Sequence, residues 1–227
     1  NKSWVSKHLE KNPDYFLDLS KGQAPSFFII GCSDSRSSLD VITQSQLGQI
    51  FSIRNVANQV SLTDVNSLAA IHLAINTLEV GHIIVCGHYQ CRGIIDTLSG
   101  PTSQLVEACI SPITHLHFRH KEMLDALSDK DRADKLSEMN VVDQLERLCK
   151  TSLLEQAFQR KNYPLLHGWI YNIYTGFIEE LPLPLHAWKT LGLIPEDYPI
   201  PVSFIASKNQ NIKEPLRSEV SDSRQTP

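Results

Sequence analysis

Two short, continuous apolar runs in the first half of the chain predict buried strands. The first extends from Ser26 to Gly31 and is followed by Cys32. The second extends from His82 to Cys86 and is followed by Gly87-His88. Uninterrupted apolar runs of this length are typical of strands that are covered on both faces, as in parallel sheets.

A helix is predicted between these two strands. Thr63-Asp64 has the residue types of a helix start, and Gly81 is expected to close the helix. The apolar positions between them recur at intervals of three and four, as one buried helix face requires: Leu68, Ile71, Ile75 and Leu78. A strand, helix, strand unit implies parallel strands joined by a right-handed crossover, so both strands end on the same edge of one sheet. Open α/β sheets place their chemistry at that edge.

The rest of the chain extends this pattern. Short amphipathic helices are expected near the amino terminus, and the apolar run from Ile50 to Ile53 suits a further strand. Residues 104–160 are expected to be helical, and the alternating residues from Gly168 to Phe177 predict one more strand. The predicted fold class is therefore α/β, with a mostly parallel central sheet flanked by helices.

Composition limits the size and the class of the protein. The 227 residues, 41% of them hydrophobic, are enough for one substantial core, and we expect one domain over residues 1–205. Residues 206–227 are polar and are expected to form a mobile tail. The net charge of -4 gives no reason to expect a nucleic-acid partner.

The cysteine count and the apolar runs indicate a compartment. Five cysteines without dense spacing argue against a secreted disulfide framework and favour a reducing environment. No run approaches the roughly 18 consecutive apolar residues that cross a membrane, and the amino terminus lacks a signal-peptide pattern. We therefore expect a cytoplasmic protein with no membrane partner.

Three residues near the predicted strand ends form a candidate zinc site. Cys91 follows His88 by three residues, so one loop can present a thiolate and an imidazole to a single ion, and Cys32 supplies a third ligand. Three protein ligands with an open fourth position are the arrangement of a catalytic zinc, whereas structural zinc usually has four. The sequence therefore predicts one zinc ion per subunit.

Asp34 is the candidate for the fourth position. It follows Cys32 by two residues, and Arg36 follows it by two, so in an extended loop all three side chains can project to one side. The carboxylate could ligate zinc directly, as a fourth metal ligand. Alternatively, it could pair with Arg36 and accept a hydrogen bond from zinc-bound water, which zinc acidifies to a pKa of about 7.

Other arrangements of the same residue types are less consistent with a site. Cys86, Cys109 and Cys149 are interpreted as core thiols. A histidine cluster has no accompanying acidic or cysteine ligand in the sequence, and we expect solvated or capping side chains there: His115, His117 and His120. A cysteine phosphatase is disfavoured because its loop has five residues between cysteine and arginine, whereas Cys32 and Arg36 have three between them.

Two motifs resemble a known family. Cys32 to Arg36 and Gly87 to Cys91 resemble the two signature motifs of the β-carbonic anhydrases, in particular the bacterial type. The resemblance implies zinc ligation by Cys32, His88 and Cys91, and an Asp34–Arg36 catalytic dyad. It also implies reversible hydration of carbon dioxide to bicarbonate and a proton, in homodimers or homotetramers whose amino-terminal helices embrace the partner subunit.

The sequence departs from the family pattern at three places. Arg92 stands where the family usually has glycine, next to the third zinc ligand, where it could crowd the cleft, attract bicarbonate, compete for Asp34 or point outward into solvent. Ser37-Ser38 replaces an apolar-proline pair and is expected to loosen the loop of Asp34. Ile29 replaces the tryptophan of a regulatory bicarbonate pocket, which argues against that pocket although its other members match Arg54 and Tyr171.

Three functional hypotheses follow. The first is an active zinc lyase in which zinc-bound hydroxide attacks carbon dioxide. The second is a zinc protein of the same fold with weak or no turnover, acting as a binding or regulatory module, and Arg92 motivates it. The third is hydrolysis of a sulfur analogue of carbon dioxide on the same scaffold.

Overall fold

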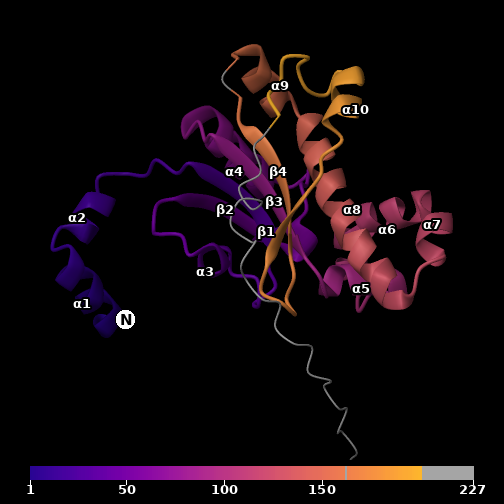
Figure 1. Ribbon diagram of the computed structural model, residues 1–227, viewed down its shortest axis with the longest axis horizontal. Coiled ribbons are helices and arrows are strands. Elements are labelled where there is room, and N and C mark those ends of the chain that lie inside the picture. The colour runs from indigo at the N-terminus through magenta and orange to yellow at the C-terminus, as the bar shows by residue number, and fades with distance from the viewer. Residues whose placement is uncertain (162, 201–227) are drawn as a thin grey trace, which may run out of the picture.

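A five-stranded sheet forms the centre of the molecule (Figure 1). The computed structural model describes residues 1–161 and 163–200. The strand order is β2-β1-β3-β4-β5, in which the first four strands are parallel and β5 is antiparallel to β4. The strands are β1 Phe27–Cys32, β2 Ile50–Asn55, β3 His82–His88, β4 Leu165–Tyr171 and β5 Ile178–Leu181. This arrangement confirms the predicted α/β class.

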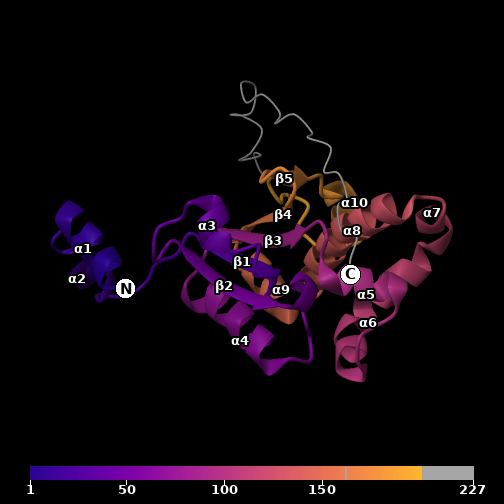
Figure 2. The ribbon, with the colours of Figure 1, turned by 90° about the horizontal axis from the view of Figure 1, so that it is seen from below.

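Helices cover both faces of the sheet. The view from below places α3 on one side of the strands and α4 on the other (Figure 2). The α-helices are α1 Lys2–Lys11, α2 Tyr15–Leu19, α3 Leu39–Thr43, α4 Val65–His72, α5 Arg92–Ser99, α6 Gln104–Arg119, α7 Lys121–Asp125, α8 Asp129–Cys149, α9 Ser152–Gln159 and α10 Leu185–Thr190. A 3-10 turn, η1 Val56–Asn58, follows β2, and a π turn, η2 Leu73–Thr77, continues α4.

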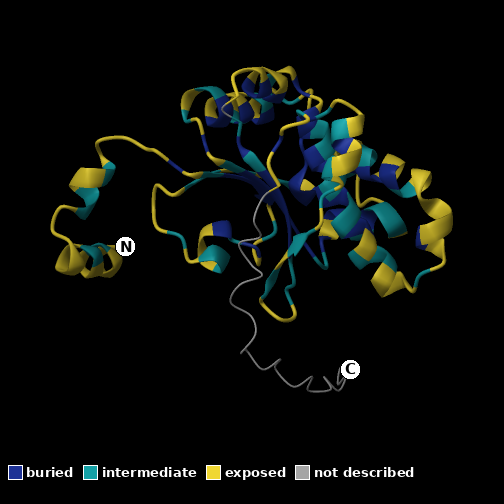
Figure 3. Ribbon diagram, turned by 45° about the horizontal axis from the view of Figure 1, so that its top comes forward, coloured by how far each residue is buried: buried dark blue, intermediate teal, exposed yellow. Residues whose placement is uncertain are grey.

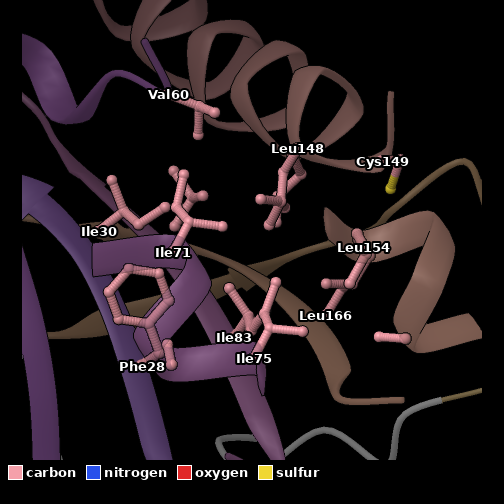
Figure 4. Packing of buried hydrophobic residues seen from close by; sticks show 14 of the residues in the cluster. Phe28, Ile30, Val60, Ile71, Ile75, Ile83, Leu148, Cys149, Leu154 and Leu166 are labelled. Carbon is pink, nitrogen blue, oxygen red and sulfur yellow. The ribbon is translucent and has the colours of Figure 1, made fainter. Parts of the chain in front are cut away.

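The side chains of β1 alternate between two apolar layers. Phe28 and Ile30 pack with residues of α4, α8 and β3, and Figure 4 shows part of this cluster. Ile29 points to the opposite layer, where it packs with Leu39 of α3 and with Trp169 of β4. Because both faces are covered, the central strand is apolar without interruption, which is why its sequence shows no alternation.

The predicted elements differ from the observed ones mainly at their ends. Asp64 is the N-cap of α4, as its residue type suggested, but the left-handed residue after the helical segment is Glu79, with φ of 49°, and not Gly81. The strand predicted over residues 168–177 is confirmed over residues 168–171, and its continuation to residue 177 is wrong. The strand β4 begins at Leu165 and ends at Tyr171, and a turn then leads into β5.

The first two helices lie apart from the body of the molecule (Figure 1). In α1 no residue is buried, and the surface of this segment is mostly exposed in Figure 3. The predicted contact of these helices with a second subunit stays a prediction. Within the described residues, none of the helices has both the length and the apolar character that a membrane crossing requires. The predicted tail, residues 206–227, lies outside the described residues.

Candidate metal centre and active site

The sheet brings three metal-binding side chains to one edge. Cys32 ends β1 and His88 ends β3, and these strands are parallel neighbours in the sheet. Cys91 follows in the next loop as the N-cap of α5. All three side chains are buried, and their ligand atoms lie within 4.8 Å of one another, the one group of this kind in residues 1–161 and 163–200. A crossover between parallel strands has therefore assembled residues that are 59 positions apart.

Close backbone packing fixes the position of this edge. A Cβ atom at Gly87 would lie 2.6 Å from the Cγ2 atom of Val141 in α8, so only glycine allows the helix to approach β3 so closely. Gln90, between the two ligands of the loop, adopts a left-handed conformation with φ of 58°. The loop thereby turns back and places Cys91 beside Cys32.

The imidazole of His88 has the tautomer that a metal ligand needs. Its Nδ1 atom lies 2.8 Å from the carbonyl oxygen of Tyr89. A carbonyl can only accept a hydrogen bond, so Nδ1 carries the hydrogen and Nε2 keeps its lone pair. Nε2 is buried and has no hydrogen-bond partner among the described residues, although an unpaired buried nitrogen is unfavourable. A bound cation would satisfy this atom.

The two sulfur atoms favour a thiolate. The Sγ atoms of Cys32 and Cys91 are 3.9 Å apart. A hydrogen bond from the Cys91 thiol, aided by His88 and the backbone at Asp34, lowers the pKa of Cys32, against the opposing effect of burial. The same hydrogen bond, which keeps the proton on Cys91, raises the pKa of Cys91, and burial and the negative charge of Cys32 add to this effect. Two thiols and an imidazole of this kind form a donor set that Zn²⁺ prefers, so the residues fit the predicted metal.

Asp34 and Arg36 form the bidentate pair that the sequence suggested. Arg36 Nε lies 2.9 Å from Asp34 Oδ1, and Arg36 Nη2 lies 2.7 Å from Oδ2. These bonds hold the pKa of Asp34 well below its usual range, so the carboxylate stays ionised at neutral pH. Arg36 also donates to the carbonyl oxygen of Gln90, at 3.2 Å, and so connects both loops of the site.

The Asp34 carboxylate is near the ligand set but outside it. Its Oδ2 atom lies 3.8 Å from His88 Nε2, whereas the group of atoms within 4.8 Å of one another contains only the two cysteines and the histidine. Ser37 is buried, and its hydroxyl donates to the Asp34 carbonyl at 3.1 Å, which adds a contact to the loop that Ser37-Ser38 was expected to loosen.

Arg54 contacts the backbone of the loop that carries Cys32 and Asp34. Its guanidinium donates to the carbonyl oxygens of Cys32, at 2.8 Å, and Asp34, at 2.7 Å. It therefore positions the backbone that carries both residues. Tyr171 lies on β4, and β1 and β3 lie between it and β2, the strand of Arg54. A regulatory bicarbonate pocket that includes both stays a prediction.

Sequence reasoning missed two buried amide side chains of α8 that hold the neighbouring loop. Gln144 accepts a hydrogen bond from the backbone N–H of Val60 at 2.8 Å, and Asn140 donates to the carbonyl of Ala57 at 3.0 Å. Ala57 has a left-handed conformation with φ of 62°, so this loop depends on outside partners. The signal in the sequence is polar residues four positions apart on a helix face that is otherwise apolar.

The remaining cysteines and the histidine cluster lie apart from the three metal-binding side chains in the described residues. Cys86 and Cys149 are buried as expected, and burial raises the pKa of each to about 12. The prediction of a core thiol at Cys109 is wrong, because this side chain is exposed on α6. His115 and His120 are exposed, and His117 lies 3.7 Å from Asp125, an acidic neighbour that the sequence did not indicate. No metal group includes these histidines in the part of the chain that the structure describes.

A cleft of about 230 Å³ opens beside Cys32, one of the three donors. Cys32 and Asp34 line one part of it, and Val56 and Val106 give it an apolar wall. Arg92 lines the cleft as well, but it pairs with Asp96 and not with Asp34. The site thus combines a metal-binding set, an ionised carboxylate and space for a small molecule.

The comparisons with known proteins agree with this geometry. Residues 27–178 match the family model described as carbonic anhydrase. A carbonic anhydrase of Emericella nidulans is 34% identical over 182 residues, which are 80% of each chain. The structures of two tetrameric β-carbonic anhydrases from Sordaria macrospora include one that is 35% identical with a TM-score of 0.76, covering 80% of this chain and 92% of that chain. The chain belongs to the β-carbonic anhydrases.

Similarity within the β-carbonic anhydrases does not single out one group of organisms. A carbonic anhydrase of Pseudomonas aeruginosa is 33% identical over 197 residues, which are 80% of this chain and 84% of that protein. The fungal and the bacterial relative therefore have about the same percentage identity to this β-carbonic anhydrase. The bacterial type expected from the motifs stays a prediction.

Proposed function

We propose that this chain catalyses the reversible hydration of carbon dioxide to bicarbonate and a proton, with one zinc ion held by Cys32, His88 and Cys91. One observation carries the proposal. The ionised carboxylate of Asp34 is fixed by Arg36 beside the buried Nε2 atom of His88, and it does not belong to the ligand set. Asp34 would therefore leave room beside the three donors for the reacting water.

Asp34 and Arg36 each have a definite task in this reaction. When bound, Zn²⁺ lowers the pKa of a water ligand to about 7 and so makes a nucleophile available near neutral pH. Arg36 keeps Asp34 ionised and oriented. Asp34 accepts a hydrogen bond from the attacking oxygen and directs its lone pair toward the substrate.

The cleft suits a small substrate of low polarity. Its valine wall offers carbon dioxide an apolar surface, and its volume excludes large molecules. The alternative of a zinc protein with little turnover was motivated by Arg92, which pairs with Asp96 and leaves Asp34 to Arg36. The side-chain placement therefore favours turnover. We further propose a homodimer or homotetramer in the cytoplasm.

Stopped-flow measurement of carbon dioxide hydration on zinc-loaded protein tests the proposal. We expect activity that is lost on removal of zinc by a chelator and in Cys32→Ser. Cys109→Ser is the matched control, because this exposed cysteine lies outside the metal group. Unchanged activity in Cys32→Ser would refute the mechanism. Turnover of carbonyl sulfide or carbon disulfide, with none of carbon dioxide, would establish the sulfur-analogue alternative.

A further inference from the structure

An ion pair lies in the wall of the cleft, outside the zinc-binding set and the dyad. Arg92 and Asp96 are one helical turn apart in α5, and Arg92 Nε lies 2.6 Å from Asp96 Oδ1. The Arg92 side chain is 68% exposed, whereas that of Asp96 is 3% exposed. Both line the same cleft as Cys32 and Asp34.

Asp96 depends on the ion pair more than Arg92 does. A buried carboxylate is unfavourable without a counter-ion, and Arg92 is the one cation paired with Asp96 among the described residues. Arg92 uses Nε for this contact. Its side chain makes no other ion pair or hydrogen bond within residues 1–161 and 163–200, so the two terminal nitrogens are available at the cleft.

We propose that Arg92, held by Asp96, binds bicarbonate at the mouth of the cleft. This inference rests on the proposed function. The planar guanidinium can donate two parallel hydrogen bonds to two oxygens of a planar oxyanion. Bicarbonate, formed or consumed at the neighbouring donors, has this geometry and a single negative charge.

Asp96 has two effects in this arrangement. It holds Arg92 against the helix and away from Asp34, whose oxygens already accept bonds from Arg36. It also offsets the charge of Arg92, so that the oxyanion binds weakly enough to leave. Removal of Asp96 therefore strengthens oxyanion binding, and removal of Arg92 leaves a buried negative charge that repels oxyanions.

A set of variants tests this proposal on zinc-loaded protein. Nitrate serves as an unreactive planar oxyanion, and its inhibition constant is measured together with kcat and KM for bicarbonate dehydration. In Arg92→Gly we expect both the nitrate constant and the KM to rise at least about threefold, as a lost partly exposed charge contact implies. Asp96→Ala should shift both in the opposite direction, and the double variant should lie between the single variants.

The controls separate the contact from general effects of charge. Arg119→Gly removes an arginine that is 58% exposed and paired with Asp143 at 2.8 Å, but that does not line the cleft, and it should leave both constants unchanged. Arg92→Lys retains the charge without the planar fork and should recover only part of the affinity. If Arg92→Gly fails to fold, Arg92→Lys and Asp96→Ala still test the proposal.

Binding measured without turnover distinguishes this inference from the proposed function. Isothermal titration calorimetry with nitrate, which the protein cannot turn over, reports oxyanion binding in each variant. Equal nitrate affinities in wild type, Arg92→Gly and Asp96→Ala would overturn the role of Arg92. Binding that depends on Arg92 in a wild-type protein that does not hydrate carbon dioxide would instead refute the proposed function and retain the oxyanion site.

Discussion

The carboxylate of Asp34 accepts two hydrogen bonds from one guanidinium while one of its oxygens lies 3.8 Å from His88 Nε2. At this distance, a small rotation of a free carboxylate would bring it to a metal ion held by His88. Arg36 is therefore the residue that decides between a carboxylate that orients water and one that occupies the metal. The competition depends on the planar fork of Arg36 and not only on its charge.

Replacement of Arg36 tests this competition. In Arg36→Ala we expect the rate of carbon dioxide hydration to fall on the order of 100-fold, the typical contribution of a positioned acid or base group, while zinc content is unchanged. Arg36→Lys should be intermediate, since it lacks the bidentate geometry. Stopped-flow rates and metal analysis measure both. A rate in Arg36→Ala equal to that of the wild type would show that Asp34 needs no partner.

Gly87 is a second residue whose identity the packing dictates. An added Cβ atom would lie 2.6 Å from Val141 Cγ2, so Gly87→Ala should lower the free energy of unfolding by about 1–3 kcal/mol through overpacking. Val141→Ala makes room, and the double variant should be destabilised by less than the sum of the single changes. Gly81→Ala is the control, because its Cβ atom would meet only Ser26 O at 3.9 Å. Denaturant unfolding measures all four, and additive effects would contradict the packing explanation.

At the scale of elements, local sequence patterns predicted those strands and helices whose burial is visible in the order of their own apolar residues. The apolar runs of β1 and β3 are long enough to indicate strands, and the parallel order placed Cys32 and His88 at one edge. The strand β4 was displaced because its neighbours are far away in the chain. The first of the alternating residues, 168–171, do lie in β4, whereas residues 172–177 form the turn before β5.

Side-chain partners across elements were beyond local patterns. Cys109 looked like a core thiol from its residue type, yet the face of α6 that carries it points to solvent. The pair of Arg92 and Asp96 is a simple spacing of four within α5, but only the tertiary structure shows that it lines the cleft. The position of a helix on the sheet, and not its propensity, decides which face is buried.

The N-cap of α4, Asp64, leads to a prediction about how the stability of the fold depends on pH. The Ser67 hydroxyl and the backbone N–H groups of Asn66 and Ser67 donate to Asp64 and lower its pKa below the ordinary value. Because the folded pKa is the lower one, this stabilisation is present above the unfolded pKa of about 4 and is lost as pH falls through the folded pKa.

Asp64→Asn keeps an acceptor at the N-cap but removes the charge. Its Tm should be a few degrees below that of the wild type at pH 7, and the difference should shrink as the pH falls below about 4. Thermal unfolding followed by circular dichroism between these conditions measures the effect. A difference that is independent of pH would show that the charge of Asp64 does not contribute.

At the scale of the whole molecule, the amino-terminal helices α1 and α2 are the feature that the contacts within residues 1–161 and 163–200 do not explain. They extend away from the body, and their aromatic side chains contact one another, with Trp4 and Phe16 ring centres 5.5 Å apart. Isolated helices shorter than about 12 residues are marginal in water. Since α1 has 10 residues and α2 has 5, and none of their residues is buried, they need a surface beyond the part of the chain that the structure describes to remain helical.

We call α1 and α2 together, residues 2–19, the arm. We therefore expect the arm to be held by a second copy of the chain and to be required for the oligomer. The wild type should have two or four times the chain mass of 25.6 kDa in light scattering after size-exclusion chromatography. Trp4→Ser combined with Leu17→Ser removes two exposed apolar side chains of the arm, 42% and 61% exposed, and should lower the mass at micromolar concentration. Leu191→Ser changes a leucine that is 68% exposed after α10, outside the arm, and should leave the mass unchanged. A wild type of 25.6 kDa would contradict this role, because the apolar surface of the arm would then have no partner to cover it. An arm variant with the mass of the wild type at every concentration would contradict it as well, because the two apolar side chains would then not be needed for the oligomer.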